Sequence, residues 1–197
     1  MVLPSFAQDA PVVDFVPTTA TPVQIDSASL IAIPVLIGSQ GPQVHFVDDI
    51  VSETGVDLLG VVVAATELDD AHPGSFVEIP VSSGLTEGQS LRSILLFGVD
   101  EGSPGQLRNA AGALARRTRG HREVTVCLRA LDDDEQLRAF VEGFVLGGFT
   151  LSAREQQPSP IASKLNLVCS EQGARVRGVL ERSTVQARAA WQARRLA

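Results

Sequence analysis

The chain has 197 residues, of which 44% are hydrophobic and 20% charged, and its formal net charge is -7. This composition is typical of one soluble globular domain with a sizeable core. The negative charge argues against non-specific nucleic-acid binding, which needs clustered lysine and arginine. We expect no membrane partner, because no apolar run reaches the roughly 18 to 20 residues of a membrane helix.

The first residues suggest a leader outside the folded domain. Four prolines fall among residues 1–22, at Pro4, Pro11, Pro17 and Pro22, in a stretch rich in threonine, alanine and aspartate. Such a composition favours extended or weakly ordered chain. We therefore predict a flexible leader over residues 1–28 and a single domain over residues 29–197.

The first strong strand is predicted at residues 30–37, an apolar run interrupted by Pro34. Proline removes a ladder donor, so this strand should lie at an edge or be bulged at that point. A loop is expected over residues 38–42. Residues 44–51 suit either a strand or the lead-in to a helix.

The remainder alternates between strand and helix patterns. Strands are predicted at residues 76–81, 93–99, 123–128 and 164–170; helices at 107–118, 133–149 and 174–197; turns or loops at 69–75, 82–90, 100–105 and 154–163. This alternation predicts an α/β fold of three layers, with a mixed, mostly parallel sheet flanked by helices. Cys127 and Cys169, the only cysteines, fall in predicted buried strands and indicate unpaired thiols in a reducing cytoplasm.

The helix that ends near Phe149 has an unusual composition. Its apolar residues recur at spacings of one, three and four, which makes one buried face. Gly143, Gly147 and Gly148 each cost roughly 1 kcal/mol of helix propensity relative to alanine. We therefore expect these glycines to allow close packing against a sheet or a helix.

Several of these segments resemble the leucyl (cytosol) aminopeptidase family. The run Glu142–Gly147, followed by Phe149, resembles its "A-x-EG-xxLG-xY-x-F" segment, and Arg108–Gly112 resembles its "R-xAAGxA" helix. The strand Ile94–Val99 resembles "VVLVGLG", with Asp100 where the pattern often has glycine. Ala187–Leu196 resembles the "A-xxxARDL" helix that leads into the catalytic domain, with Arg195 in place of aspartate. The order matches over roughly residues 29–197.

The resemblance implies a macro-domain-like, non-catalytic amino-terminal domain, and it favours a helix over residues 56–65, where β-branched residues alone favour a strand. The parent would be a cytoplasmic, homo-hexameric enzyme that releases amino-terminal residues from peptides. Its catalytic domain, the expected partner of this one, would bind two divalent ions, Zn or Mn, through carboxylates and a lysine. The alternative is a free-standing macro-like module that binds a nucleotide or ADP-ribose.

No catalytic, cofactor-binding or metal-binding residue of the family can be carried onto this chain. Its "NTDAEGR" stretch has no counterpart here, and Lys164 lies in a predicted strand outside any such pattern. We therefore expect these 197 residues alone to have no peptidase activity.

Other polar groups have simpler structural interpretations. Residues 98–105 form a glycine-rich loop, but Asp100 and Glu101 would repel a phosphate, so a plain connection is favoured. The aspartates at 132–134 are interpreted as a helix cap. The remaining candidates are interpreted as loop or surface groups without a site: His45, His72 and His121; Asp69 and Asp70; Ser183 and Thr184; and the basic cluster Arg116, Arg117, Arg119 and Arg122, for which a helix end is preferred over an anion or partner contact.

Overall fold

The computed structural model describes residues 10–22, 29–39, 41–44, 47–68, 70–81, 91–129, 131–149 and 159–196. In chain order its elements are β1 (Asp14–Thr18), β2 (Leu30–Gly38), β3 (Gly41–Val44), α1 (Val47–Thr54), α2 (Leu58–Ala64), the 3-10 helix η2 (Thr66–Leu68), β4 (Phe76–Pro80), β5 (Ser93–Asp100), α3 (Pro104–Arg117), β6 (Glu123–Cys127), α4 (Asp134–Gly147), β7 (Lys164–Val168) and α5 (Ala174–Leu196). Among these helices none is both long and apolar enough to cross a membrane. The predicted loop at 82–90, residues 151–158, and residues 1–9 and 23–28 of the predicted leader lie outside the described ranges.

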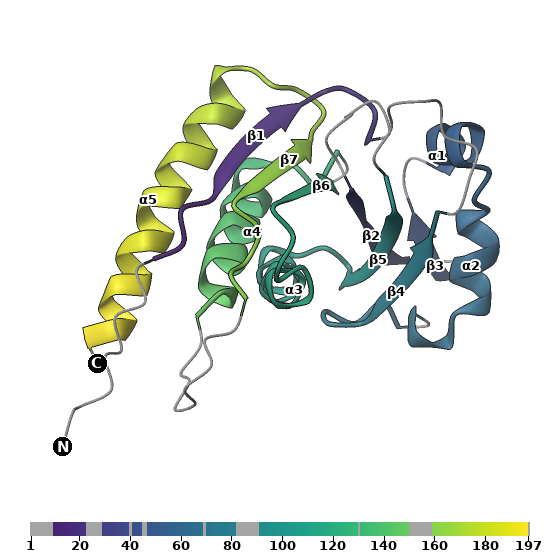
Figure 1. The fold of residues 1–197 in the computed structure, drawn as a ribbon, viewed down its shortest axis with the longest axis horizontal. Helices are drawn as coiled ribbons and strands as arrows, with labels where there is room; N and C mark the ends of the chain where they lie inside the picture. The colour runs from purple at the N-terminus through teal and green to yellow at the C-terminus, as the bar shows by residue number, and fades with distance from the viewer. Residues whose placement is uncertain are drawn as a thin grey trace.

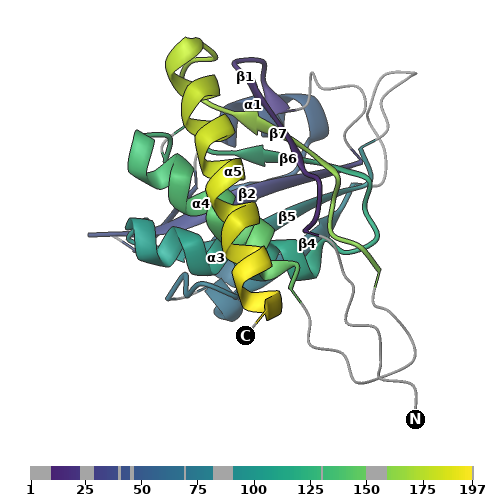
Figure 2. The same ribbon diagram turned by 90° about the vertical axis from the view of Figure 1, so that its left-hand side faces the viewer.

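The strands form one seven-stranded sheet in the order β1-β7-β6-β2-β5-β4, with β3 paired to β2. The strands from β1 to β5 along this order pair in parallel, whereas β4 and β3 pair antiparallel. Helices α3, α4 and α5 lie on one side of the sheet and α1 and α2 on the other (Figures 1 and 2). The predicted three-layer, mostly parallel α/β fold is confirmed.

The central strand β2 contributes side chains to the cores on both faces of the sheet. Leu30 and Ala32 belong to the core shared with α3, α4 and α5, whereas Ile31 and Ile33 belong to the core shared with α1 and α2. Successive side chains of a strand point to opposite faces, so a strand covered on both sides must be apolar throughout. This explains why the sequence of β2 reads as one apolar run.

The amino-terminal segment does not behave as the predicted leader. Asp14–Thr18 form β1, which pairs with β7 at the edge of the sheet. The N–H of Asp14 donates to the Ser163 carbonyl on the β7 side. Alternation along the strand then turns the nitrogen of Pro17 towards the free edge, where no ladder donor is required. The prediction of a leader is therefore wrong for this strand, because an edge position accommodates the prolines that suggested disorder.

Pro34 lies inside a central strand and not in an edge strand. On one side of β2, β6 pairs only with Ile31 and Ala32, and β3 pairs from Val35 onward. Pro34 occupies the gap between these two partners, so its missing N–H interrupts no ladder. On the other side, the register with β5 shifts between Val35 and Leu36. The bulge expected at the proline therefore lies just beyond it.

The region between β2 and β4 was ambiguous in sequence. The expected loop is shorter than predicted, because β3 begins at Gly41, and the segment after it forms α1. Helix α2 confirms the helix expected over residues 56–65. Leu58 and Val62 are buried while Val63 is 84% exposed, so the spacing of buried residues is helical despite the β-branched composition.

Both cysteines are buried and unpaired, as predicted. Burial raises the pKa of the Cys127 thiol well above its ordinary value. Burial, helped by the charge of Asp132, raises the pKa of Cys169 to about 12. Both side chains therefore serve as small apolar groups of the core at neutral pH.

Helices α3 and α4 touch through their backbones. A Cβ atom on Gly143 would lie 2.1 Å from the carbonyl oxygen of Arg108, and one on Gly147 would lie 2.5 Å from the Cα of Gly112. Separations this short leave no room for a side chain between the helices. The expected close packing against a helix is confirmed at Gly143 and Gly147, whereas a Cβ atom on Gly148 would lie 3.0 Å from the side chain of Ile161, outside any helix or strand.

Removing residues 1–20 would delete β1 and expose the edge of β7. We expect the free energy of unfolding to fall by about 3 kcal/mol, because burying a side chain such as Val13 or Phe15 is worth roughly 1.5 to 3 kcal/mol. Urea unfolding followed by the fluorescence of Trp191, the only tryptophan, measures the loss. A chain lacking only residues 1–9 keeps β1 and is the control; equal stability of the two shortened chains would show that β1 contributes nothing.

Substituting Gly143→Ala should destabilise the protein by about 2 kcal/mol, because overpacking a tight contact typically costs 1 to 3 kcal/mol. The matched control is Gly105→Ala in the first turn of α3, where nothing lies within 4 Å of the added Cβ. That change should be neutral or stabilising by up to about 1 kcal/mol. Chemical denaturation followed by circular dichroism compares the two variants. Equal stabilities would disprove the backbone contact between α3 and α4.

Candidate functional site

The carboxyl ends of the parallel strands are the first place to look for a site. In open α/β sheets, ligands bind at the carboxyl ends of the strands. Strands β5, β6 and β7 are each followed by a helix on the same face, so the loops that begin α3, α4 and α5 meet at this edge (Figure 1).

The polar groups of the loop between β5 and α3 form hydrogen bonds within the protein. The hydroxyl of Ser103 accepts the N–H of Gln106 at 3.4 Å, and the side chain of Gln106 accepts the N–H of Ser103 at 3.0 Å. The N–H groups of Asp100 and Gly102 donate to backbone carbonyls of Ala71 and Val99. The amides of Asp100, Gly102 and Ser103 are thus already bonded within the chain, and the plain connection stays a prediction.

The start of α4 is tied to that loop. Asp133 caps the helix, since its carboxylate accepts the N–H of Gln136 at 2.8 Å. The amide group of Gln136 in turn donates to the carbonyl of Gly102 at 3.0 Å. The predicted helix cap is therefore confirmed for the middle aspartate of the three.

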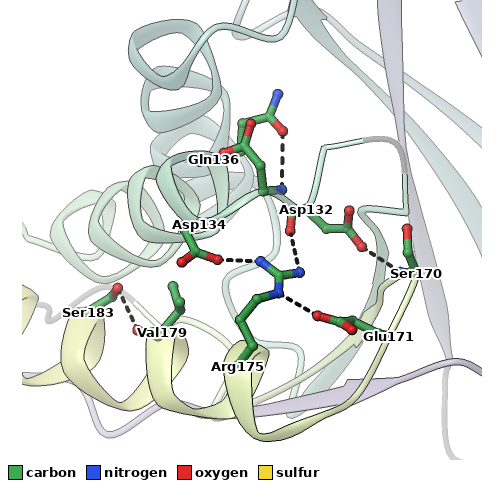
Figure 3. A network of polar contacts seen from close by, with 9 residues as sticks. Asp132, Asp134, Gln136, Ser170, Glu171, Arg175, Val179 and Ser183 are labelled. Carbon is green, nitrogen blue, oxygen red and sulfur yellow. Dashed lines mark hydrogen bonds and ion pairs between the residues drawn. The ribbon is translucent and has the colours of Figure 1, made fainter.

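The other two aspartates belong to a network centred on Arg175 (Figure 3). The guanidinium of Arg175, in the first turn of α5, forms ion pairs with Asp134 and Glu171. It also donates to the Asp132 carbonyl at 3.5 Å, while the Asp132 carboxylate accepts the N–H of Ser170 at 2.5 Å. Hydrogen bonds to Glu171 and Asp134 raise the pKa of Arg175. We call these five residues the Arg175 network.

The Arg175 network holds the β7–α5 loop against the beginning of α4. Its ion pairs are solvent-exposed, so each contributes little free energy and acts mainly on geometry. The network was not anticipated from the sequence. The only hint was the i, i+4 spacing of Glu171 and Arg175, which is typical of a helical ion pair.

A second polar contact lies at the α3–α4 crossing. Glu142, whose side chain is 20% exposed, forms an ion pair with Arg108 at 2.8 Å and with Arg138 at 3.5 Å. Both Nε and Nη2 of Arg108 donate to the same carboxylate oxygen. Glu142 therefore links α4 to α3 through an ion pair. It does so next to Gly143, and this glycine allows the two helices to approach each other.

The basic cluster at the end of α3 is partly structural. Arg117 forms an ion pair with Glu78 at 2.9 Å, and Arg119 donates to the Gly148 carbonyl at 3.0 Å. Arg119 thereby satisfies the carboxyl end of α4. Burial, followed by the charge of Arg116, lowers the pKa of Arg119. These contacts fit the preferred interpretation of a helix end.

The remaining candidates are dispersed. His72 precedes β4 and His121 follows α3, while His45 and Asp69 lie outside the described residues. The N–H of His72 donates to Asp70 at 3.1 Å, as in an ordinary turn. Within the described part of the chain, no group of three or more histidine, cysteine, aspartate or glutamate side chains is placed to hold a metal ion.

Ser183 and Thr184 donate their hydroxyls to helix carbonyls four residues earlier, at 2.7 Å each. Lys164 forms an ion pair with Glu123 of the neighbouring strand at 3.0 Å. Neither contact resembles an activated nucleophile, whose hydroxyl or amine must face a base and the substrate. The two hydroxyl contacts lie within α5, and the ion pair joins the neighbouring strands β6 and β7.

No protein-family model and no curated protein sequence matches the chain. Solved structures do resemble it. A mutant of tomato leucine aminopeptidase matches with a TM-score of 0.66 and 18% identity, over 91% of this chain and 37% of that one. The bottromycin maturation enzyme BotP, solved in complex with Mn, matches with a TM-score of 0.50 and 20% identity, over 83% of this chain and 30% of that one.

A mutant macrodomain of Oceanobacillus iheyensis, solved with ADPR, matches with a TM-score of 0.54 and 11% identity, over 87% of this chain and 90% of that one. The chain therefore has a macro-like fold, and this fold also occurs in the amino-terminal regions of leucine aminopeptidases. It spans 37% of the tomato enzyme and 30% of BotP, so each of those chains continues well beyond the matched region.

Proposed function

We propose that this chain is the non-catalytic amino-terminal domain of a leucyl-type aminopeptidase that uses two divalent ions to release amino-terminal residues from peptides. The observation that carries the proposal is the likeness to tomato leucine aminopeptidase, which extends over 91% of this chain but only 37% of that enzyme. The catalytic machinery would then lie in a further domain, which would be the partner of this one.

The contacts between α3 and α4 support the proposal. Arg108 and Gly112 come from the segment that resembles one family motif, and Glu142, Gly143 and Gly147 come from the segment that resembles another. In the structure Arg108 pairs with Glu142, and Gly112 meets Gly147. The two motifs therefore form one helix–helix contact, which gives a physical reason for their occurring together.

The densest carboxylates of the chain are engaged in structural contacts. Asp132 accepts the N–H of Ser170, Asp133 caps α4, and Asp134 pairs with Arg175. A two-metal centre instead needs several carboxylates converging on ions about 3.5 to 4 Å apart. Under this proposal the Zn or Mn ions, the homo-hexameric assembly and the cytoplasmic location belong to the whole enzyme.

The competing function is a free-standing module that binds a nucleotide or ADP-ribose. It is favoured by the match to 90% of the Oceanobacillus macrodomain chain. Against it, the carboxylates of Asp100 and Asp132 lie at the carboxyl ends of the strands, where a phosphate would have to bind. Anionic ligands are disfavoured where carboxylates face them.

We predict that the purified 197-residue chain does not hydrolyse leucine p-nitroanilide, with or without excess Mn²⁺ or Zn²⁺. The physical reason is that its clustered carboxylates bind backbone amides and an arginine, and within the described residues no three acidic, histidine or cysteine side chains are placed to hold an ion. Isothermal calorimetry with ADP-ribose on the same preparation should detect no micromolar binding.

The control for contaminating host peptidases is the Asp134→Asn variant, prepared in parallel. Metal-dependent turnover that is present in the unsubstituted chain and lost in this variant would place an active site here and refute the proposal. Micromolar ADP-ribose binding without turnover would favour the competing module.

A further inference from the structure

A groove of about 440 Å³ lies over the crossing of α3 and α4. It is bordered by both helices, by the loop before β4 and by the carboxyl-terminal part of α5. It shares no lining residue with the Arg175 network. The groove is therefore a separate feature of the surface.

The base of the groove is formed where the two helices touch. Gly112, Gly143 and Gly147 line it, and all three are buried in the contact between the helices. The guanidinium of Arg116 reaches back over this base, since its Nη1 lies 3.7 Å from the position of a Cβ built on Gly112. A small ligand in the groove would therefore lie beside this cationic side chain, above the buried contact between the two helices.

The walls of the groove are positively charged. Arg108, Arg116 and Arg194 line it together with His72, and none of its described lining residues is an aspartate or glutamate. The three arginines come from two helices, α3 and α5, of a chain whose net charge is -7. Like charges gathered this way repel one another unless an anion lies between them.

Most of these charges have no ion-pair partner among the described residues. Arg108 uses its Nε and Nη2 for Glu142, which leaves Nη1 available. Arg116 and Arg194 form no ion pair with any carboxylate in the described part of the chain. Arg117 and Arg119, next to Arg116 along the chain, both have protein partners.

We infer that this groove binds a small dianionic group, a phosphate or a dicarboxylate, held by the guanidinium groups of Arg116 and Arg194. The planar guanidinium donates two parallel hydrogen bonds to the oxygens of such anions. Arg108 also lines the groove. The inference does not rest on the proposed aminopeptidase function and concerns a different part of the molecule from the carboxyl ends of the strands.

The test is a titration of the 197-residue chain with inorganic phosphate, at ionic strength held constant with chloride, followed by two-dimensional amide NMR. We expect saturable shifts at Gly112, Gly143 and Gly147. The double variant Arg116→Ala/Arg194→Ala should weaken binding about tenfold or more, since one charge-assisted hydrogen bond alone is worth roughly 1.5 kcal/mol or more.

Arg188→Ala removes an exposed arginine from the same helix as Arg194 and should leave phosphate affinity unchanged. A parallel titration with malonate distinguishes the two sources of the anion, because the preferred ligand will saturate at lower concentration. Equal weakening by Arg188→Ala, or the absence of saturable shifts at the three glycines in the unsubstituted chain, would overturn the inference. The second result decides the question even if the double variant fails to fold.

Discussion

The direct contact between the backbones of α3 and α4 determines how the larger helical layer is built. It requires glycine at the crossing, and each glycine costs the helix roughly 1 kcal/mol of propensity. In return α4 lies deep in the core, where Phe140 and Phe144 are fully buried. Phe144 meets Phe15 of β1 edge-on, with ring centroids 6.3 Å apart, so the same helix also secures the edge strand. Helix α5 follows, with Trp191 against Phe149 at 5.0 Å.

The packed helices have two polar surfaces, one at the carboxyl ends of the strands and one over the α3–α4 crossing. At the carboxyl ends of the strands, the Arg175 network joins the β7–α5 loop to the start of α4, and Gln136 joins α4 to the loop before α3. Over the crossing itself, the glycine backbones are buried, and Arg108 and Arg116 lie beside the contact. At the first surface the aspartates bind backbone amides and Arg175. At the second surface Arg116 and Arg194 form no ion pair among the described residues.

Much of the fold was predictable from sequence, because buried strands and amphipathic helices have distinct periodicities. The alternation from β5 to α5 and the glycine contact followed from local pattern. Strand β1 did not, since a short edge strand containing Pro17 resembles disordered chain until its partner β7 is known. The Arg175 network and the groove also escaped prediction: Asp134 and Arg175 are far apart in sequence, and Arg194 reaches the groove only through the packing of α5 on α4.

The central claim is that this domain is one part of a larger two-metal aminopeptidase. The most direct measurement is the intact mass and metal content of the natural protein, captured from its source with an antibody raised against this chain. The account predicts a species much heavier than 20.8 kDa that carries about two divalent ions per subunit. A metal-free species of 20.8 kDa would contradict it.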